Sequence, residues 1–165
     1  MPIEIISEDL VEETWREVAG FSPSRGRKEM DRVGERQPDL LTFMVAFTED
    51  LDQDVKELAL YMFFVVYRIF EKGSKKKIKK ISSKDVMKAY ESNEKLLERL
   101  EGAHEKFIER IAGTQVAAQP FVMNYVVDTL MEMPEETDPI ELTEEDSGYL
   151  YLLFKTVIDL LNQAG

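Results

Sequence analysis

The sequence contains no cysteine and one histidine, His104. The absence of cysteine excludes disulfide bonds, thiolate nucleophiles, iron–sulfur clusters and cysteine-ligated zinc. A single imidazole also excludes a metal site that takes several histidine ligands from one chain. We therefore expect no metal centre and no other cofactor.

His104 does form a Glu-x-x-His pair with Glu101, which would place a carboxylate and an imidazole on one helix face. Di-iron bundles use such pairs, but they need two pairs from the same bundle, and this chain has one histidine. Gly102 also weakens the helix at this point. The pattern favours an exposed or helix-capping histidine.

Glycine and proline are scarce, with 8 and 6 among 165 residues, which predicts long elements and few turns. No apolar run reaches the roughly 18 residues that suggest a membrane span. The N-terminal sequence MPIEIISEDL lacks the basic start and the apolar centre of a secretion signal. We expect a cytoplasmic protein without a membrane span. Glycine-rich phosphate loops and nucleophile elbows are also absent from the sequence.

Negative charge predominates, with a formal net charge of −12. Residues 111–165 carry 1 basic and 10 acidic side chains, and an acidic face of this kind repels nucleic acid. Acidic pairs such as Glu49-Asp50 stand at expected helix N-termini. The helix dipole and capping account for them there without a catalytic role.

A lysine-rich linker at residues 74–82 is the main exception to this acidity. Such a run can neutralise the phosphates of a nucleic acid or an anionic lipid. It lacks the arginines and aromatic residues that base readout and stacking favour, so nucleic acid is a disfavoured partner. A solvated linker that balances an acidic protein is the favoured interpretation. The candidate anion-binding residues are Lys75, Lys76, Lys77, Lys79 and Lys80.

Apolar residues recur at helical spacing along the chain, and this predicts an all-α fold. The densest apolar run, Leu58 to Tyr67, lies in a helix expected at about residues 52–72. A helix that is apolar all round is usually buried on several sides, so this helix should be central. We predict one domain, 1–165, that forms a multi-helix bundle of about eight helices. Other helices are expected from Ser7 to Gly20, over 25–36, from Pro38, from Ser82 or Ser83 to Gly113 with a break at Gly102, from Pro120, and over about 144–163.

The two halves of the chain show related patterns in the same order, and the offset between matched positions grows from 76 to 90 where loops are expected. This indicates an internal duplication of a four-helix unit, with halves 7–73 and 83–163 joined by the basic linker 74–82. Chance similarity between apolar helices is the competing interpretation. A short HEAT-like stack is the alternative packing. The clearest matches are Ser7–Val11 with Ser83–Met87, Gln37-Pro38 with Gln119-Pro120, and Leu60-Tyr61 with Leu150-Tyr151.

Tyr61 and Tyr151 are the candidate pocket residues, because they recur at matched places in the two halves. Packing in the core is the favoured interpretation for both. Trp15 lies on the apolar stripe of the first predicted helix.

The sequence offers many apolar helices and no reactive group of residues. We therefore expect a non-catalytic helical protein-interaction or adaptor module that binds a protein partner or a second copy of itself. An anion- or nucleic-acid-binding regulator that uses the lysine-rich linker is one alternative. A small-ligand-binding protein or an enzyme with a pocket between the two halves is another.

Overall fold

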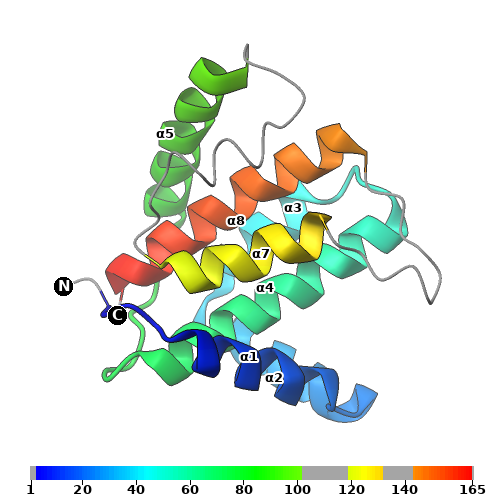
Figure 1. Ribbon diagram of the computed structural model, residues 1–165, viewed down its shortest axis with the longest axis vertical. Coiled ribbons are helices and arrows are strands. Elements are labelled where there is room, and N and C mark those ends of the chain that lie inside the picture. The colour runs from blue at the N-terminus through cyan, green and yellow to red at the C-terminus, as the bar shows by residue number, and fades with distance from the viewer. Residues whose placement is uncertain (1–2, 102–118, 132–142, 165) are drawn as a thin grey trace.

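The computed structural model describes residues 3–101, 119–131 and 143–164 (Figure 1). Their regular structure is entirely helical, and they contain seven helices where about eight were predicted. The predicted helical stripe from Gly102 to Gly113, including His104, and the acidic loop at 134–139 lie outside the described residues. The helices are α1 Glu8–Ala19, α2 Pro23–Arg36, α3 Pro38–Phe47, α4 Gln53–Gly73, α5 Ser83–Glu101, α7 Pro120–Met131 and α8 Glu144–Ala164.

Side-chain hydroxyl groups fix the start of four helices. Each accepts a hydrogen bond from the backbone N–H three residues further on, which satisfies a donor that the first turn leaves unpaired. The helix predicted over 25–36 begins two residues earlier, because Ser22 caps α2 and Pro23 takes its first position. The four capping residues are Ser7, Ser22, Ser82 and Thr143, with distances between 3.0 and 3.2 Å.

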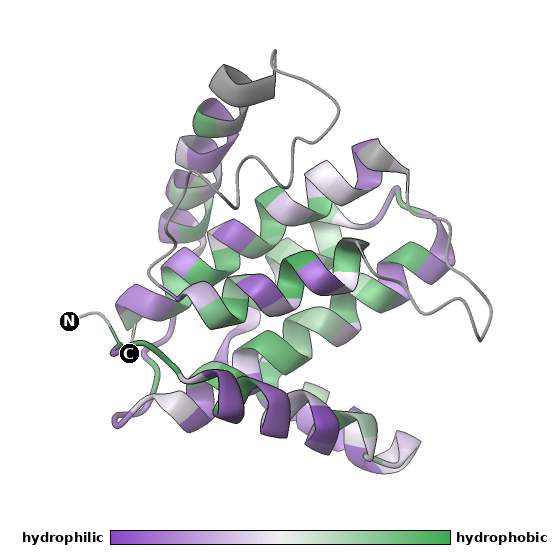
Figure 2. Ribbon diagram, viewed as in Figure 1, coloured by the Kyte–Doolittle hydropathy of each residue, from purple (hydrophilic) through white to green (hydrophobic). Residues whose placement is uncertain are grey.

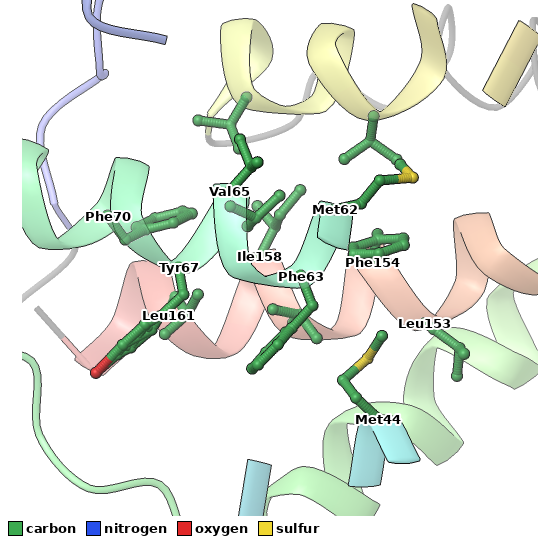
Figure 3. Packing of buried hydrophobic residues seen from close by; sticks show 14 of the residues in the cluster. Met44, Met62, Phe63, Val65, Tyr67, Phe70, Leu153, Phe154, Ile158 and Leu161 are labelled. Atoms are coloured by element: carbon green, nitrogen blue, oxygen red, sulfur yellow. The ribbon is translucent and has the colours of Figure 1, made fainter. Parts of the chain in front are cut away.

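α4 is the central helix, as the apolar run from Leu58 to Tyr67 predicted, and ten of its residues are buried. α8 lies beside it and runs in the same direction. Figure 3 shows Phe70 and Leu161 toward one end of this pair and Met62 and Phe154 toward the other. Figure 2 shows apolar residues along the middle of α4 and polar residues on the outer face of α1. Removal of these apolar side chains from water is the main force that holds the bundle together.

The outer helices pack in matching pairs. α1 packs on α4 as α5 packs on α8, and α7 contacts α1 as α3 contacts α5. Figure 1 shows α1 and α7 on the near side of the central pair and α3 on the far side. In a HEAT-like stack each repeat contacts only its neighbours, so the contact between α1 and α7 makes this fold a bundle.

Two buried glutamines fasten the extended segments that precede α1 and α5. Gln119, directly before α7, accepts a hydrogen bond from the N–H of Ile6 and donates to two backbone carbonyls of the same segment. Gln37, directly before α3, accepts from the N–H of Ile81 and donates to the carbonyl of Lys79. Each half of the chain therefore holds the first segment of the other half.

Ion pairs join α1, α2 and α4 at the surface. Arg68 of α4 donates a hydrogen bond to Glu17 of α1. Arg32 of α2 donates to both carboxylate oxygens of Glu71 at 2.9 Å, the two-pronged geometry that a planar guanidinium favours. The hydrogen bond from Arg68 is the main reason why the pKa of Glu17 lies below its ordinary value. These pairs fasten the first two helices to the central one.

Candidate functional site

A groove with a volume of about 640 Å³ lies between α1, α4 and α7. α1 and α4 belong to the first predicted half and α7 to the second, so the groove lies between the halves. Aromatic, polar and acidic side chains from all three helices line it. Its mixed lining makes it the leading candidate for a binding site in the described part of the chain.

Aromatic rings form much of the wall of this groove. Trp15 of α1 is 38% exposed and Tyr61 of α4 is 42% exposed, which is unusual for side chains of this size. Phe121 and Tyr125 of α7 complete the wall and are half-buried. Burial raises the pKa of Tyr125, and the nearby phenol of Tyr61 raises it further. Both tyrosines are therefore neutral at pH 7.

Three exposed carboxylates, Glu8, Glu12 and Asp128, accompany these rings, and among the described residues no lysine, arginine or histidine lines the groove. Arg16 lies beside it on α1. The guanidinium of Arg16 pairs with Glu12 at 2.6 Å, and its central carbon is 5.4 Å from the centroid of the Trp15 ring. The groove thus combines an aromatic wall with a negatively charged rim.

The matching contact between α3 and α5 is filled. Phe47 lies 4.5 Å from Phe43 and 4.8 Å from Tyr90, measured between ring centroids. Counted from the Gln-Pro pair that begins each helix, Thr129 of α7 takes the position that Phe47 takes in α3. The capping residues are Ser7 and Ser82, one position away from the sequence match of Ser7 with Ser83, and counted from these caps Trp15 takes the position of Tyr90. The groove is therefore open where the other side of the bundle holds an aromatic ring.

Tyr61 and Tyr151, which the predicted repeat pairs, lie in different environments. Tyr61 lines the groove, whereas Tyr151 of α8 is 1% exposed and does not line it. α4 and α8 are both 21 residues long and follow Asp52 and Thr143. Counted from these residues, Tyr61 corresponds to Leu152, one position beyond Tyr151. By this count the two tyrosines do not take matching positions.

Sequence reasoning did not single out Trp15, Tyr125 or Asp128 as site residues. The structure brings all three together with Tyr61. One signal was present in the sequence: Asp128 and Thr129 interrupt the apolar pattern of α7. α3 has an alanine and a phenylalanine at the corresponding positions. Only the packing of α7 against α1 shows that this interruption opens a groove.

The five lysines of the basic linker are all exposed. The linker itself is extended and is tied to the core through the buried side chains of Ile78 and Ile81. Lys75, Lys76 and Lys77 line a hollow of about 380 Å³ together with Arg36 and Ser74, among other residues. The hollow is open and polar, and it could accommodate an anion.

A buried polar cluster between α5 and α8 was also missed. Lys155 donates hydrogen bonds at 2.9 Å to the side chains of Asn93 and Asp159. Asn93 in turn donates to Thr156 and Asp159. The side chains of the cluster are hydrogen-bonded to one another. A cluster of this kind fixes the alignment of the two helices that carry it, here α5 and α8. Lys155 stood out in the sequence as the only lysine in the last apolar helix.

Metal-binding chemistry finds no support among the described residues, where no group of histidine, aspartate and glutamate side chains is suited to hold an ion. None of the helices in this part of the chain is long and apolar enough to cross a membrane. No protein-family model matches the chain, and no similar curated protein or solved structure was found. The groove is therefore the feature of the described residues that bears most directly on function.

Proposed function

We propose that this chain is a non-catalytic protein-interaction module that binds a segment of a partner protein in the groove between α1, α4 and α7. The exposed aromatic side chains of Trp15 and Tyr61 are the observation that supports it most. Aromatic residues of this kind dominate the binding energy of protein interfaces when a partner covers them. Burial of apolar surface contributes about 25 cal/mol per Å², so covering two such rings is a substantial gain.

The comparison between the two sides of the bundle also supports a binding role. Phe47 and Tyr90 satisfy each other within the fold, whereas the groove has Thr129 in the place of Phe47. A phenylalanine at 129 would fill the space and add to the core. Within the described residues the aromatic wall instead stays exposed, and a bound molecule could cover it. Among the described lining residues there is also no histidine or lysine that could act with the carboxylates as an acid–base pair, which favours binding over catalysis.

The test uses the variant Thr129→Phe, which fills the groove in the way that Phe47 fills the opposite side. Thr42→Phe is the matched control, because Thr42 is exposed on α3 and does not line the groove. Immobilised wild-type protein and both variants are exposed to a lysate of the cells that express the chain. Quantitative mass spectrometry then identifies what each retains. We expect wild type and Thr42→Phe to retain a common partner that Thr129→Phe loses.

The purified partner is then titrated against the wild-type chain while the fluorescence of Trp15 is recorded. Trp15 is the only tryptophan in the sequence, so its emission reports directly on the groove. A saturable change in Trp15 emission with the wild-type chain supports the proposal. A partner that Thr129→Phe retains equally well, or that leaves Trp15 emission unchanged, shows that binding occurs elsewhere.

We also infer that the two halves, 7–73 and 83–163, arose by duplication of one unit. The crossed hydrogen bonds of Gln37 and Gln119 support this, because equivalent residues make equivalent bonds in opposite directions. If the halves descend from one dimeric unit, two separate chains cut within the linker 74–82 should assemble when expressed together. Failure of the co-expressed halves to form a folded complex would count against a dimeric origin.

Anion binding by the linker is a second candidate, supported by the exposure of its lysines around the hollow beside Arg36. Replacement of Lys75, Lys76, Lys77, Lys79 and Lys80 by alanine should then abolish a low-salt gel shift with nucleic acid. Absence of a shift with the wild-type protein excludes nucleic acid as the anion.

A further inference from the structure

We infer that the partner segment in the groove is basic, and that one of its lysine or arginine side chains lies against the ring of Trp15 or Tyr61 and the acidic rim. This inference rests on the proposed function and names the chemistry of the partner. Three features of the groove carry it: its charge, the environment of Trp15, and the contrast with the filled side of the bundle.

The charged residues that line the groove in the described part of the chain are all acidic. Glu8 and Glu12 come from α1 and Asp128 comes from α7, so carboxylates lie on two of its sides. A basic segment would be attracted to these groups, and an acidic segment would be repelled. The apolar part of a lysine or arginine side chain can lie along the aromatic wall while its charged end reaches the carboxylates. The lining thus complements both parts of such a side chain.

Arg16 shows that these groups can hold a cation. Its guanidinium pairs with Glu12 at 2.6 Å and lies 5.4 Å from the ring centroid of Trp15. A cation within about 6 Å of an aromatic ring is attracted by the negative charge of the ring face. Arg16 is exposed and does not line the groove, so it leaves the inner positions to the partner. Inside the groove, Tyr61 and Asp128 supply a further ring and a further carboxylate.

The filled side of the bundle lacks these charges. By the same counting from caps and Gln-Pro pairs, Ser83, Met87 and Ala46 take the positions of Glu8, Glu12 and Asp128. The filled side therefore lacks a carboxylate at these three positions, and an acidic group beside its rings, Glu94, accepts a hydrogen bond from Tyr90 at 3.4 Å. A need for solubility does not explain why the carboxylates lie at the groove, because charged residues on the outer face of either helix pair would make the protein equally soluble.

The test is a selection from a library of random peptides displayed on phage. Immobilised wild-type protein captures the peptides, and soluble Thr129→Phe removes those that do not depend on the groove. We expect the surviving peptides to be enriched in lysine and arginine next to an apolar residue. Their affinity, measured through Trp15 emission, should fall as salt is raised, because salt screens exposed charges beyond a Debye length of about 8 Å.

Reversing the charge of two groove carboxylates then tests whether these groups attract the basic peptides. The double variant Glu12→Lys, Asp128→Lys should bind the selected basic peptides about tenfold more weakly, since each exposed ion pair contributes only modestly. Glu13→Lys is the control for added charge, because Glu13 is exposed on α1 but does not line the groove. Equal weakening by Glu13→Lys would show that net charge, and not the groove, governs affinity, and would overturn the inference.

The possible results of the selection distinguish a failure of this inference from a failure of the proposed function. Groove-dependent peptides that are neutral or acidic overturn the inference and leave the binding module intact. A selection that yields no groove-dependent peptide counts against both. If light scattering shows a wild-type oligomer that Thr129→Phe converts to a monomer, the occupant is a second copy and the separate basic partner is excluded. Tetramethylammonium that competes as strongly as the peptides would indicate a site for small cations and would likewise exclude a peptide segment.

Discussion

Phe47 and Tyr90 face each other with ring centroids 4.8 Å apart where α3 meets α5, and this contact closes one side of the bundle. On the other side, Thr129 and Trp15 hold the corresponding positions and line a groove. One aromatic ring in place of a threonine thus separates a closed contact from an open one. The proposed function follows from the open side.

The crossed glutamines should contribute strongly to stability. Gln119→Leu leaves the buried N–H of Ile6 without its acceptor, and Gln37→Leu does the same to Ile81. Each variant should lose about 1–3 kcal/mol of unfolding free energy in urea denaturation, the usual cost of a buried unpaired polar group. The exposed Gln53 supplies the control Gln53→Leu, which should change stability little. Losses no larger than that of the control would show that water replaces these bonds.

Replacement by alanine should destabilise the protein at one helical glycine and stabilise it at another. A Cβ at Gly73 would lie 2.6 Å from Cγ1 of the buried Ile6, so Gly73→Ala should cost about 1–3 kcal/mol by overpacking. A Cβ at Gly26 would meet nothing within 4 Å, so Gly26→Ala should stabilise the protein by about 0.4–1 kcal/mol. Thermal unfolding measures both. A stable Gly73→Ala would mean that the first segment moves away from α4 at little cost.

Acid should weaken the attachment of α1 to α4. The hydrogen bond from Arg68 is the main cause of the lowered pKa of Glu17, so the folded state favours the charged carboxylate. Its contribution is fully present above the ordinary pKa of 4.5 and is lost as the pH falls through the lower pKa of the folded state. Glu17→Gln should therefore be less stable than wild type at pH 7, and the difference should shrink below pH 4.5.

Urea denaturation across this pH range measures that difference, with Glu13→Gln as the control on the same helix. A difference between wild type and Glu17→Gln that stays constant with pH would show that the pair with Arg68 does not depend on the charge of Glu17.

Local signals in the sequence were sufficient to predict most of the helices. The apolar run from Leu58 to Tyr67 predicted the central helix, and Pro38 and Pro120 marked helix starts correctly, because these features act within one or two turns. The matching of Tyr61 with Tyr151 did not identify a shared pocket, because Tyr61 lines the groove whereas Tyr151 is buried in the core. Helical spacing predicts that both residues are helical but does not show which neighbours cover them.

The groove itself could not be predicted from local pattern. Trp15 lies on a helical stripe that also carries buried residues, and nothing in that stripe shows that its ring stays partly exposed beside α7. Asp128 and Thr129 became informative only when the contact of α7 with α1 could be compared with that of α3 with α5. Such comparisons need tertiary structure, because the residues that form the groove come from three separate helices.

The central claim is that the aromatic wall of the groove binds a partner segment. The most direct measurement is the emission of Trp15 while a peptide selected against the groove is added to the wild-type chain and to Thr129→Phe. The account predicts a saturable blue shift in the wild type, as the ring leaves water, and no peptide-dependent shift in Thr129→Phe. Identical titration curves for the two proteins, or no shift in either, would contradict it.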